Sequence, residues 1–232
     1  IVRYKDEVGR LWTTLADYHI RRGLFEKARD VYMEGLSSIV TVRDFSLVYD
    51  ALTQFEEALI SSAIGDDNEQ EEDSKDAAMG ACNFLLHDTG DDLELRLARL
   101  EHLIEGRPEL LNSVILRQNP HNVNEWHKRA KLFPQDAAKR IAVYTEAVKM
   151  VEPALAVGNP HSLWISFAKV YESNGDLENA RSVFDRASRF PFLYVDNLAT
   201  VWTEWIEMEL RHENFSAALN LARRGTTVPS IR

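Results

Sequence analysis

The sequence predicts an all-α protein, a solenoid of about six helix-turn-helix repeats, from three observations. A 25-residue pattern at residues 11–35 recurs without a gap at 163–187. No segment shows the sustained apolar–polar alternation of a β-strand. Four of the five tryptophans are separated by 114, 38 and 38 residues, and they are Trp12, Trp126, Trp164 and Trp202. The first separation is three times 38, and a period of about 20–50 residues is typical of solenoids.

Six repeat units follow from this period, anchored at positions 12, 49, 94, 126, 164 and 202. The last unit has an aromatic or apolar residue at offsets 0, 3 and 6 and an acid at offset 7. The residues at these four offsets are Trp202, Trp205, Met208 and Glu209 in the last unit, Tyr49, Leu52, Phe55 and Glu56 in the second, and Glu94, Leu97, Leu100 and Glu101 in the third. The third unit is the weakest match because Glu94 replaces the aromatic residue.

Each clear unit reads as two helices. In the first unit, Trp12, Leu15, Ala16 and His19 follow the spacing of one helical stripe, and Gly23 supplies a helix stop. The second helix carries on one face Phe25, Ala28, Val31, Tyr32, Gly35 and Leu36. Small residues recur at the position of Gly35, and they are Ala147, Ala187 and Gly225. We expect them to let neighbouring units pack closely.

Turn signals agree with this division. Asp176 in SNGD is expected to cap a helix, and Asn119-Pro120 and Asn159-Pro160 each precede a tryptophan-bearing helix. The fourth unit is two residues short, which predicts a tighter turn around Phe133-Pro134.

Twelve residues are the expected structural repeat positions. We expect them to form the core between stacked helices, because a lone helix pair cannot bury its apolar face. They are Trp12, Ala28, Tyr32, Tyr49, Phe55, Trp126, Tyr144, Trp164, Ala180, Phe184, Trp202 and Ala218.

The domain expectation is a single repeat segment, 1–232, with an acidic loop at about 62–80 inside it. Residues 65–76 hold seven acids and one lysine, within a chain of net charge −10. This stretch reads as a solvated loop or, alternatively, as a docking strip for a basic partner. The overall charge argues against capture of nucleic acid by the chain as a whole. The sequence does not begin with Met, so we expect it to be an internal part of a longer protein.

Residues that carry chemistry are few, so the sequence predicts no enzyme, no cofactor and no metal site. Neither a phosphate-binding glycine loop nor a metalloprotease HExxH motif is present. His121, His127 and His161 lack the spacing of metal ligands, and the single Cys82 lacks a nucleophile signature.

Adjacent charges are equally uninformative about chemistry. The paired acids Glu56-Glu57 and Asp91-Asp92 point different ways on a helix, which is a weak basis for catalysis. The basic pairs read as ordinary surface charge, and they are Arg21-Arg22, Lys128-Arg129 and Lys139-Arg140.

The tryptophan in the first helix and the Ala-Arg-x-Val-aromatic run in the second resemble the half-a-TPR, or HAT, repeat. Longer strings resemble the family of large HAT-repeat pre-mRNA-splicing factors of the NineTeen complex, known in animals as XPA-binding HAT proteins. The strings include LWTTLADYHIRRGLFEKARDVYMEGL, RLARLEHLIEGRPELLNSVILRQNPHNVNEWHKR and GNPHSLWISFAKVYESNGDLENARSVFDRA. The likeness extends over nearly the whole chain, except the acidic loop.

This resemblance implies a non-catalytic, nuclear scaffold of the spliceosome. The implied partners are other NineTeen-complex subunits and the crooked-neck-like HAT protein, with RNA contacted through the assembly and transcription-coupled repair factors as further candidates. No membrane is implied. The alternative is a HAT scaffold of another RNA-processing machine, for mRNA 3′-end cleavage or ribosomal-RNA processing. More distant alternatives are a general tetratricopeptide adaptor and an enzyme with a cryptic site.

Overall fold

The computed structural model describes residues 7–65 and 90–227. This part of the chain is helical, with no strand and one isolated bridge between Asn122 and Val157. The all-α prediction is therefore confirmed. The chain divides into two compact units, 1–118 and 119–232. The single-segment expectation stays a prediction.

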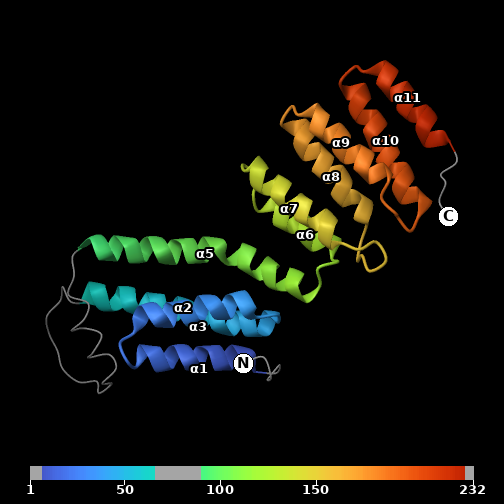
Figure 1. The fold of residues 1–232 in the computed structure, drawn as a ribbon. Coiled ribbons are helices and arrows are strands. Elements are labelled where there is room, and N and C mark those ends of the chain that lie inside the picture. Colours follow the sequence, from blue (N-terminus) through green and yellow to red (C-terminus); the bar gives the residue numbers. More distant parts are fainter. Residues whose placement is uncertain (1–6, 66–89, 228–232) are drawn as a thin grey trace. The chain divides into compact units, whose positions relative to one another are not determined.

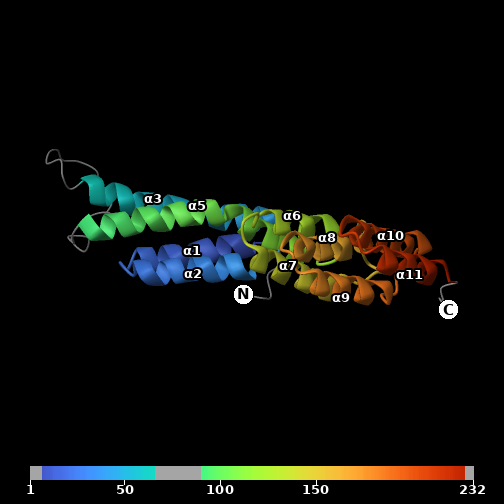
Figure 2. The same ribbon diagram turned by 90° about the horizontal axis from the view of Figure 1, so that it is seen from above.

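The first unit contains four described helices in two layers. They are α1 (Val8–Ile20), α2 (Phe25–Ser38), α3 (Val42–Gly65) and α5 (Gly90–Gln118). Figure 2 shows α1 and α2 in one layer and α3 and α5 in the other. Tyr32, Phe45 and Leu52 are among the fully buried side chains between the layers, and Arg117 of α5 donates to the carbonyl oxygens of Leu36, Ser37 and Ile39 at the end of α2.

The second unit is three successive antiparallel helix pairs. The pairs are α6 (Val123–Lys131) with α7 (Ala137–Met150), α8 (Pro160–Ser173) with α9 (Leu177–Ser188), and α10 (Val195–Arg211) with α11 (Phe215–Thr226). The first helices of the pairs contact one another, α6 with α8 and α8 with α10. They form one layer and the second helices form the other (Figure 2).

The repeat unit expected at Glu94 is not a separate helix pair. The segment from Gly90 to Gln118 is one continuous helix, and α5 packs along α3 as its antiparallel partner. Pro108 lies inside α5 without ending it, and Figure 1 shows that this helix bends along its length. The described residues form five helix pairs, and the unit expected at Glu94 lies within the single helix α5.

The first residues of the acidic loop expected at about 62–80 are helical instead. Helix α3 continues to Gly65, so residues 62–65 belong to the helix. The remainder of the expected loop, together with Cys82, lies outside the described residues.

A tryptophan against a small residue joins the two helices of a pair. A Cβ atom added at Gly35 of α2 would lie 3.0 Å from Cγ of Trp12 in α1. A Cβ atom added at Gly225 of α11 would lie 3.3 Å from Cγ of Trp202 in α10. The sequence correctly marked these positions for close approach, but it placed the contact between units, whereas it lies within one pair.

Three of the turns inside the pairs use a left-handed residue. Gly23 and Gly175 stand at the ends of α1 and α8 with φ of 71° and 78°, and Asp176 caps α9 by accepting from the Asn179 amide at 3.1 Å. In the last pair this position is held by Glu213 with φ of 60°. A non-glycine residue in this conformation costs about 1–2 kcal/mol.

The fourth unit, anchored at Trp126, is short in its first helix and not in its turn. Helix α6 ends five residues after Trp126, whereas α8 ends nine residues after Trp164. The link from α6 to α7 has five residues, 132–136, against three from α8 to α9. The expected tighter turn is therefore wrong, because Pro134 disfavours helix in the residue before it and ends α6 early. Pro160 begins α8 as expected, but α6 begins at Val123 with Asn122 as its cap, three residues after Pro120.

Replacing Gly35 by leucine should lower the free energy of unfolding by about 1–3 kcal/mol, because the side chain must displace Trp12. Calorimetry of the purified chain measures the effect. The control is Gly106→Ala in α5, where an added Cβ meets nothing within 4 Å and alanine should be neutral or slightly stabilising. Equal melting of Gly35→Leu and the unchanged chain would contradict the packing.

Exchanging the turn residues should have opposite effects in two pairs. Gly175→Ala should destabilise by about 1 kcal/mol, because φ is positive although space is free. Glu213→Gly should be neutral or stabilise by up to about 1 kcal/mol, since relief of backbone strain outweighs the added chain entropy. Urea titrations of both variants measure the two changes in the free energy of unfolding. A destabilised Glu213→Gly would show that Glu213 is not strained.

Candidate functional site

The twelve expected repeat positions lie inside the two units. Eleven of them are buried, and Trp202 alone is partly exposed. Trp202 stacks on Trp205 with ring centroids 5.5 Å apart, and the Arg224 guanidinium lies 5.4 Å from its ring. Trp126 donates its indole N–H to the Pro120 carbonyl at 2.8 Å, which ties α6 to the turn before it. The eleven buried residues of this set pack the helices against one another.

Successive helix pairs meet through aromatic rings. In three pairs, the aromatic residue of the second helix lies against a ring in the first helix of the next pair. The centroid distances are 6.0 Å for Tyr32–Phe55, 6.2 Å for Tyr144–Phe167 and 5.9 Å for Phe184–Trp205. Such contacts add about 0.5–1.5 kcal/mol beyond the burial of their area. The same residue position therefore faces the next pair at three interfaces.

A buried ion pair joins the first two helix pairs beside this aromatic contact. Arg29 of α2 donates from Nε to Glu56 Oε1 of α3 at 2.5 Å and from Nη2 to Oε2 at 3.1 Å. The Glu56 side chain is almost fully buried, and Arg29 also pairs with Glu26 at 2.7 Å. The hydrogen bonds to Glu56 raise the pKa of Arg29 above its usual value. A forked pair of this kind fixes direction as well as distance.

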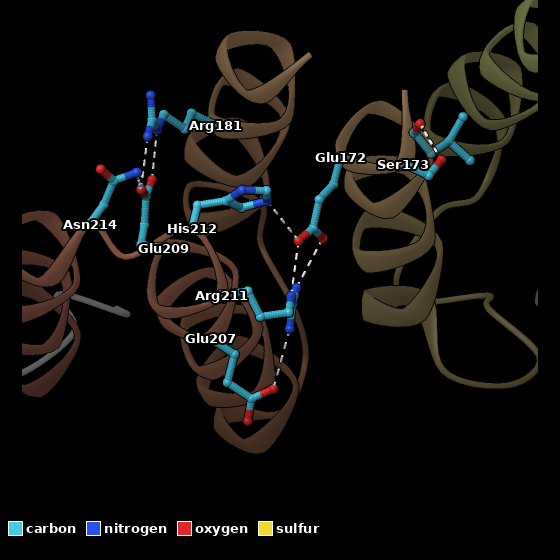
Figure 3. Close-up of polar contacts among 9 residues, drawn as sticks. Glu172, Ser173, Arg181, Glu207, Glu209, Arg211, His212 and Asn214 are labelled. Carbon is cyan, nitrogen blue, oxygen red and sulfur yellow. Dashed lines mark hydrogen bonds and ion pairs between the residues drawn. The ribbon is translucent and has the colours of Figure 1, made fainter. Parts of the chain in front are cut away.

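The same arrangement recurs between the last two pairs, as Figure 3 shows. Arg181 of α9 donates from Nε and Nη2 to the two carboxylate oxygens of Glu209 in α10, at 2.7 and 2.8 Å. Glu209 is 2% exposed and also accepts from Asn214 Nδ2 at 3.1 Å. Hydrogen bonding from Arg181 lowers the pKa of Glu209, against the opposing effect of burial. The carboxylate is therefore ionised and fully engaged at neutral pH.

The two ion pairs occupy equivalent positions. Each arginine follows the buried alanine of a second helix, Ala28 or Ala180, and each glutamate stands at offset 7 in the next first helix. Between α7 and α8 the equivalent positions hold Ile141 and Tyr171. This interface carries a different polar link, in which His127 Nε2 of α6 lies 2.8 Å from Ser162 Oγ of α8. The polar contacts between successive pairs therefore differ from one interface to another.

A second ionic cluster lies across α8 and α10. Arg211 donates to both carboxylate oxygens of Glu172 at 2.9 Å, and His212 Nε2 lies 3.3 Å from Glu172 Oε1 (Figure 3). The bonds from Arg211 lower the pKa of Glu172. Lys169 and Glu204 add an ion pair of 2.8 Å between the same helices. The interface between these pairs is thus held by charges on both of its edges.

His121, His127 and His161 take part in packing and local hydrogen bonds. Burial lowers the pKa of His127 and of His161, so both favour the neutral form. The His127 ring lies edge-on to Tyr144, and His121 Nδ1 accepts from the Glu152 amide at 3.2 Å. Within residues 7–65 and 90–227, no group of three or more His, Cys, Asp or Glu could hold a metal ion. In the same ranges, no helix is long and apolar enough to cross a membrane.

The paired charges of the sequence separate as expected where they are described. Glu56 is buried against Arg29 while Glu57 is exposed, and the side chains of Asp91 and Asp92 lie outside the described residues. Among the basic pairs, Arg22 lies over the Tyr18 ring, Lys128 pairs with Glu125 at 2.7 Å, and Lys139 lies over Phe133.

Sequence reasoning missed the Arg–Glu pairs, although the arginine and the glutamate each belong to a repeat pattern that it identified. The Ala-Arg run and the glutamate at offset 7 were each identified as repeat features. Their spacing of 27 or 28 residues places them on consecutive pairs. The available signal was an acid at the same offset in two units, with an arginine in the preceding helix each time. This combination could have predicted the ion pairs.

Replacing Glu209 by glutamine should lower the free energy of unfolding by about 1–3 kcal/mol at pH 7, because Arg181 loses a charge partner at a buried site. Arg181 is itself 40% exposed, which keeps the cost below that of a fully buried pair. The control Glu7→Gln removes a solvent-exposed partner of Arg10 and should change stability by less than about 0.5 kcal/mol.

The lowered pKa of Glu209 also predicts that its contribution to stability depends on pH. Because the folded pKa of Glu209 is lowered, its stabilisation is present above the unfolded pKa of about 4.3 and is lost as the pH falls through the folded pKa. The difference between the unchanged chain and Glu209→Gln should therefore shrink on acidification from pH 6 to 3 in thermal melts. A constant difference across that range would show that the carboxylate charge does not stabilise the fold.

Comparison with known proteins accounts for the repeats. The family model described as pre-mRNA-splicing factor SYF1 middle HAT repeat matches residues 1–151, and that described as pre-mRNA-splicing factor Syf1/CRNKL1 C-terminal HAT repeat matches 153–232.

Curated relatives agree with these family models. The human pre-mRNA-splicing factor SYF1 is 48% identical over 232 residues, all of this chain and 26% of the relative. The Drosophila melanogaster syf1 homolog is 48% identical over 98% of this chain and 24% of its own length. The Schizosaccharomyces pombe factor cwf3 is 42% identical over 95% of this chain and 26% of its own length. The chain thus spans about a quarter of these relatives, and it belongs to the SYF1 family of HAT-repeat pre-mRNA-splicing factors.

Proposed function

We propose that this chain is a non-catalytic scaffold segment that organises protein partners in the spliceosome during pre-mRNA splicing, in the nucleus. The observation that carries the proposal is the match of two SYF1-type repeat models over residues 1–151 and 153–232. Relatives that are 42–48% identical carry the name pre-mRNA-splicing factor. Stacked helix pairs offer extended surfaces for binding other proteins.

The contacts between pairs suit such a role. In each unit, aromatic contacts and charged hydrogen bonds fix how one pair meets the next, as at Phe184–Trp205 and Arg181–Glu209. Surface side chains carried by these helices are thereby held at set distances within the unit. Apolar side chains in the links between pairs remain exposed and are candidates for partner contacts, and they include Leu155, Val157, Leu193 and Tyr194. A few such anchors carry most of the energy of a protein interface.

The partners we propose are NineTeen-complex subunits and the crooked-neck-like HAT protein. Support for spliceosomal partners in general comes from the relatives, which are named pre-mRNA-splicing factors. RNA would be contacted through the assembly, since the chain carries a net charge of −10.

Affinity purification of the tagged chain from nuclear extract, with and without RNase, tests this function. We expect NineTeen-complex and other spliceosomal proteins to be recovered equally in both conditions. A tetratricopeptide protein of similar size and acidity serves as the control bait. Recovery of mRNA 3′-end cleavage or ribosomal-RNA processing factors would favour the alternative scaffold, and loss of every partner with RNase would favour direct RNA binding.

A further inference from the structure

Helices α3 and α5 are longer than their neighbours. They contain 24 and 29 residues, whereas α1 and α2 contain 13 and 14. Figures 1 and 2 both show the α3–α5 pair extending beyond the ends of α1 and α2. The two long helices run antiparallel, since Tyr49 donates to the Leu103 carbonyl at 2.9 Å and Arg96 to the Leu59 carbonyl at 3.4 Å. Part of their surface therefore has no α1–α2 layer to cover it.

A groove follows the seam between α3 and α5. Its volume is about 320 Å³, and Tyr49, Asp50, Thr53, Glu57, Ile104 and Arg107 line it. Ile104 is 53% exposed although it is a large aliphatic residue. Leu100 and Leu97 stand four and seven residues before Ile104, on the same face of α5, and Leu97 is 47% exposed. The groove thus continues along α5 as an apolar stripe.

The charge beside this stripe is acidic. Asp50 and Glu57 line the groove from α3, and Glu94 and Glu101 are exposed on α5 beside Leu97. The one basic residue of the groove, Arg107, lies over the Tyr49 ring at 5.1 Å. The other arginines of this part of α5 are engaged elsewhere, Arg96 with the Leu59 carbonyl and Arg99 with Glu26 at 3.7 Å.

We propose that the groove between α3 and α5 binds an amphipathic basic helix of a partner protein. An apolar stripe on the partner would cover Ile104, Leu100 and Leu97, and lysine or arginine at its edges would meet Asp50 and Glu57. A helix fits because apolar residues at three- and four-residue spacing match the stripe on α5, in the manner of a helix laid into a two-helix groove. The inference rests on the proposed role in binding proteins and names the chemistry of one partner.

A synthetic peptide of about 18 residues, or roughly 27 Å of helix, provides the probe. It carries leucine at every third or fourth position and lysine elsewhere, and a matched peptide carries glutamate in place of lysine. Fluorescence anisotropy with the whole chain should give saturable binding of the lysine peptide, with Kd of about 1–100 µM at about 0.1 M salt. The glutamate peptide should bind at least about tenfold more weakly.

Two variants locate the binding. Ile104→Asp and Glu57→Lys should each weaken the lysine peptide by about tenfold or more. The aspartate adds negative charge, so weaker binding there reports the lost apolar contact and not electrostatics. Met33→Asp on α2 is the matched control, because Met33 is also exposed, at 47%, on another helix of the same unit. It should bind as the unchanged chain does, and circular dichroism should show all variants folded.

Three outcomes would overturn the proposal. They are binding that does not saturate, binding by Ile104→Asp equal to that of the unchanged chain, and equal weakening by Met33→Asp. A dimer of the chain in analytical ultracentrifugation that Ile104→Asp dissociates would assign the groove to self-association instead. Because the peptide assay uses only the purified chain, its failure leaves the splicing partners of the purification experiment untouched, and the reverse also holds.

Discussion

The close contact between a tryptophan and a residue with little or no side chain determines how the helices of a pair meet. Trp12 against Gly35 and Trp202 against Gly225 leave no room for a further carbon atom without displacement of the indole. Ala147 of α7 and Ala187 of α9 stand at the same position in two further pairs, and both are completely buried. Because the bulk lies on one helix only, the second helix can turn its own aromatic residue toward the next pair. The rings of Tyr32, Tyr144 and Phe184 are used in that way.

The buried charges limit the arrangement of one pair relative to the next. A carboxylate as buried as Glu209 is tolerated in the fold only while its oxygens are paired, and Arg181 and Asn214 do this. Apolar contacts allow many similar arrangements, whereas a forked bond between guanidinium and carboxylate allows few. The pairs Arg29–Glu56 and Arg181–Glu209 therefore set orientation where the aromatic contacts supply attraction. In the next interface Ile141 of α7 and Tyr171 of α8 replace them, and the His127–Ser162 contact between α6 and α8 provides the polar link.

The repeat period predicted most of the fold because tryptophan, alanine and glycine have few alternatives at these positions. It located the helix pairs, the left-handed Gly23 and Gly175, and the cap at Asp176. It could not show that α5 is a single helix, because Pro108 is usually a helix breaker and here lies inside the helix. Nor could it find the left-handed Glu213, since strain that neighbouring contacts overcome leaves no trace in residue type. The Arg–Glu pairs were missed because they join different repeats.

The same limits explain why a repeat pattern locates a scaffold and not its binding surface. By offset alone, Leu97 and Leu100 match Leu52 and Phe55 of the second unit. Leu52 and Phe55 are buried, but Leu97 is exposed, because α5 already packs on α3 through another face. An apolar residue that matches the repeat yet remains outside the core is stabilised by nothing in the described fold. Leu97 and Ile104 are such residues, and carboxylates of α3 lie beside Ile104. Exposed apolar side chains that the core does not need mark a candidate binding surface.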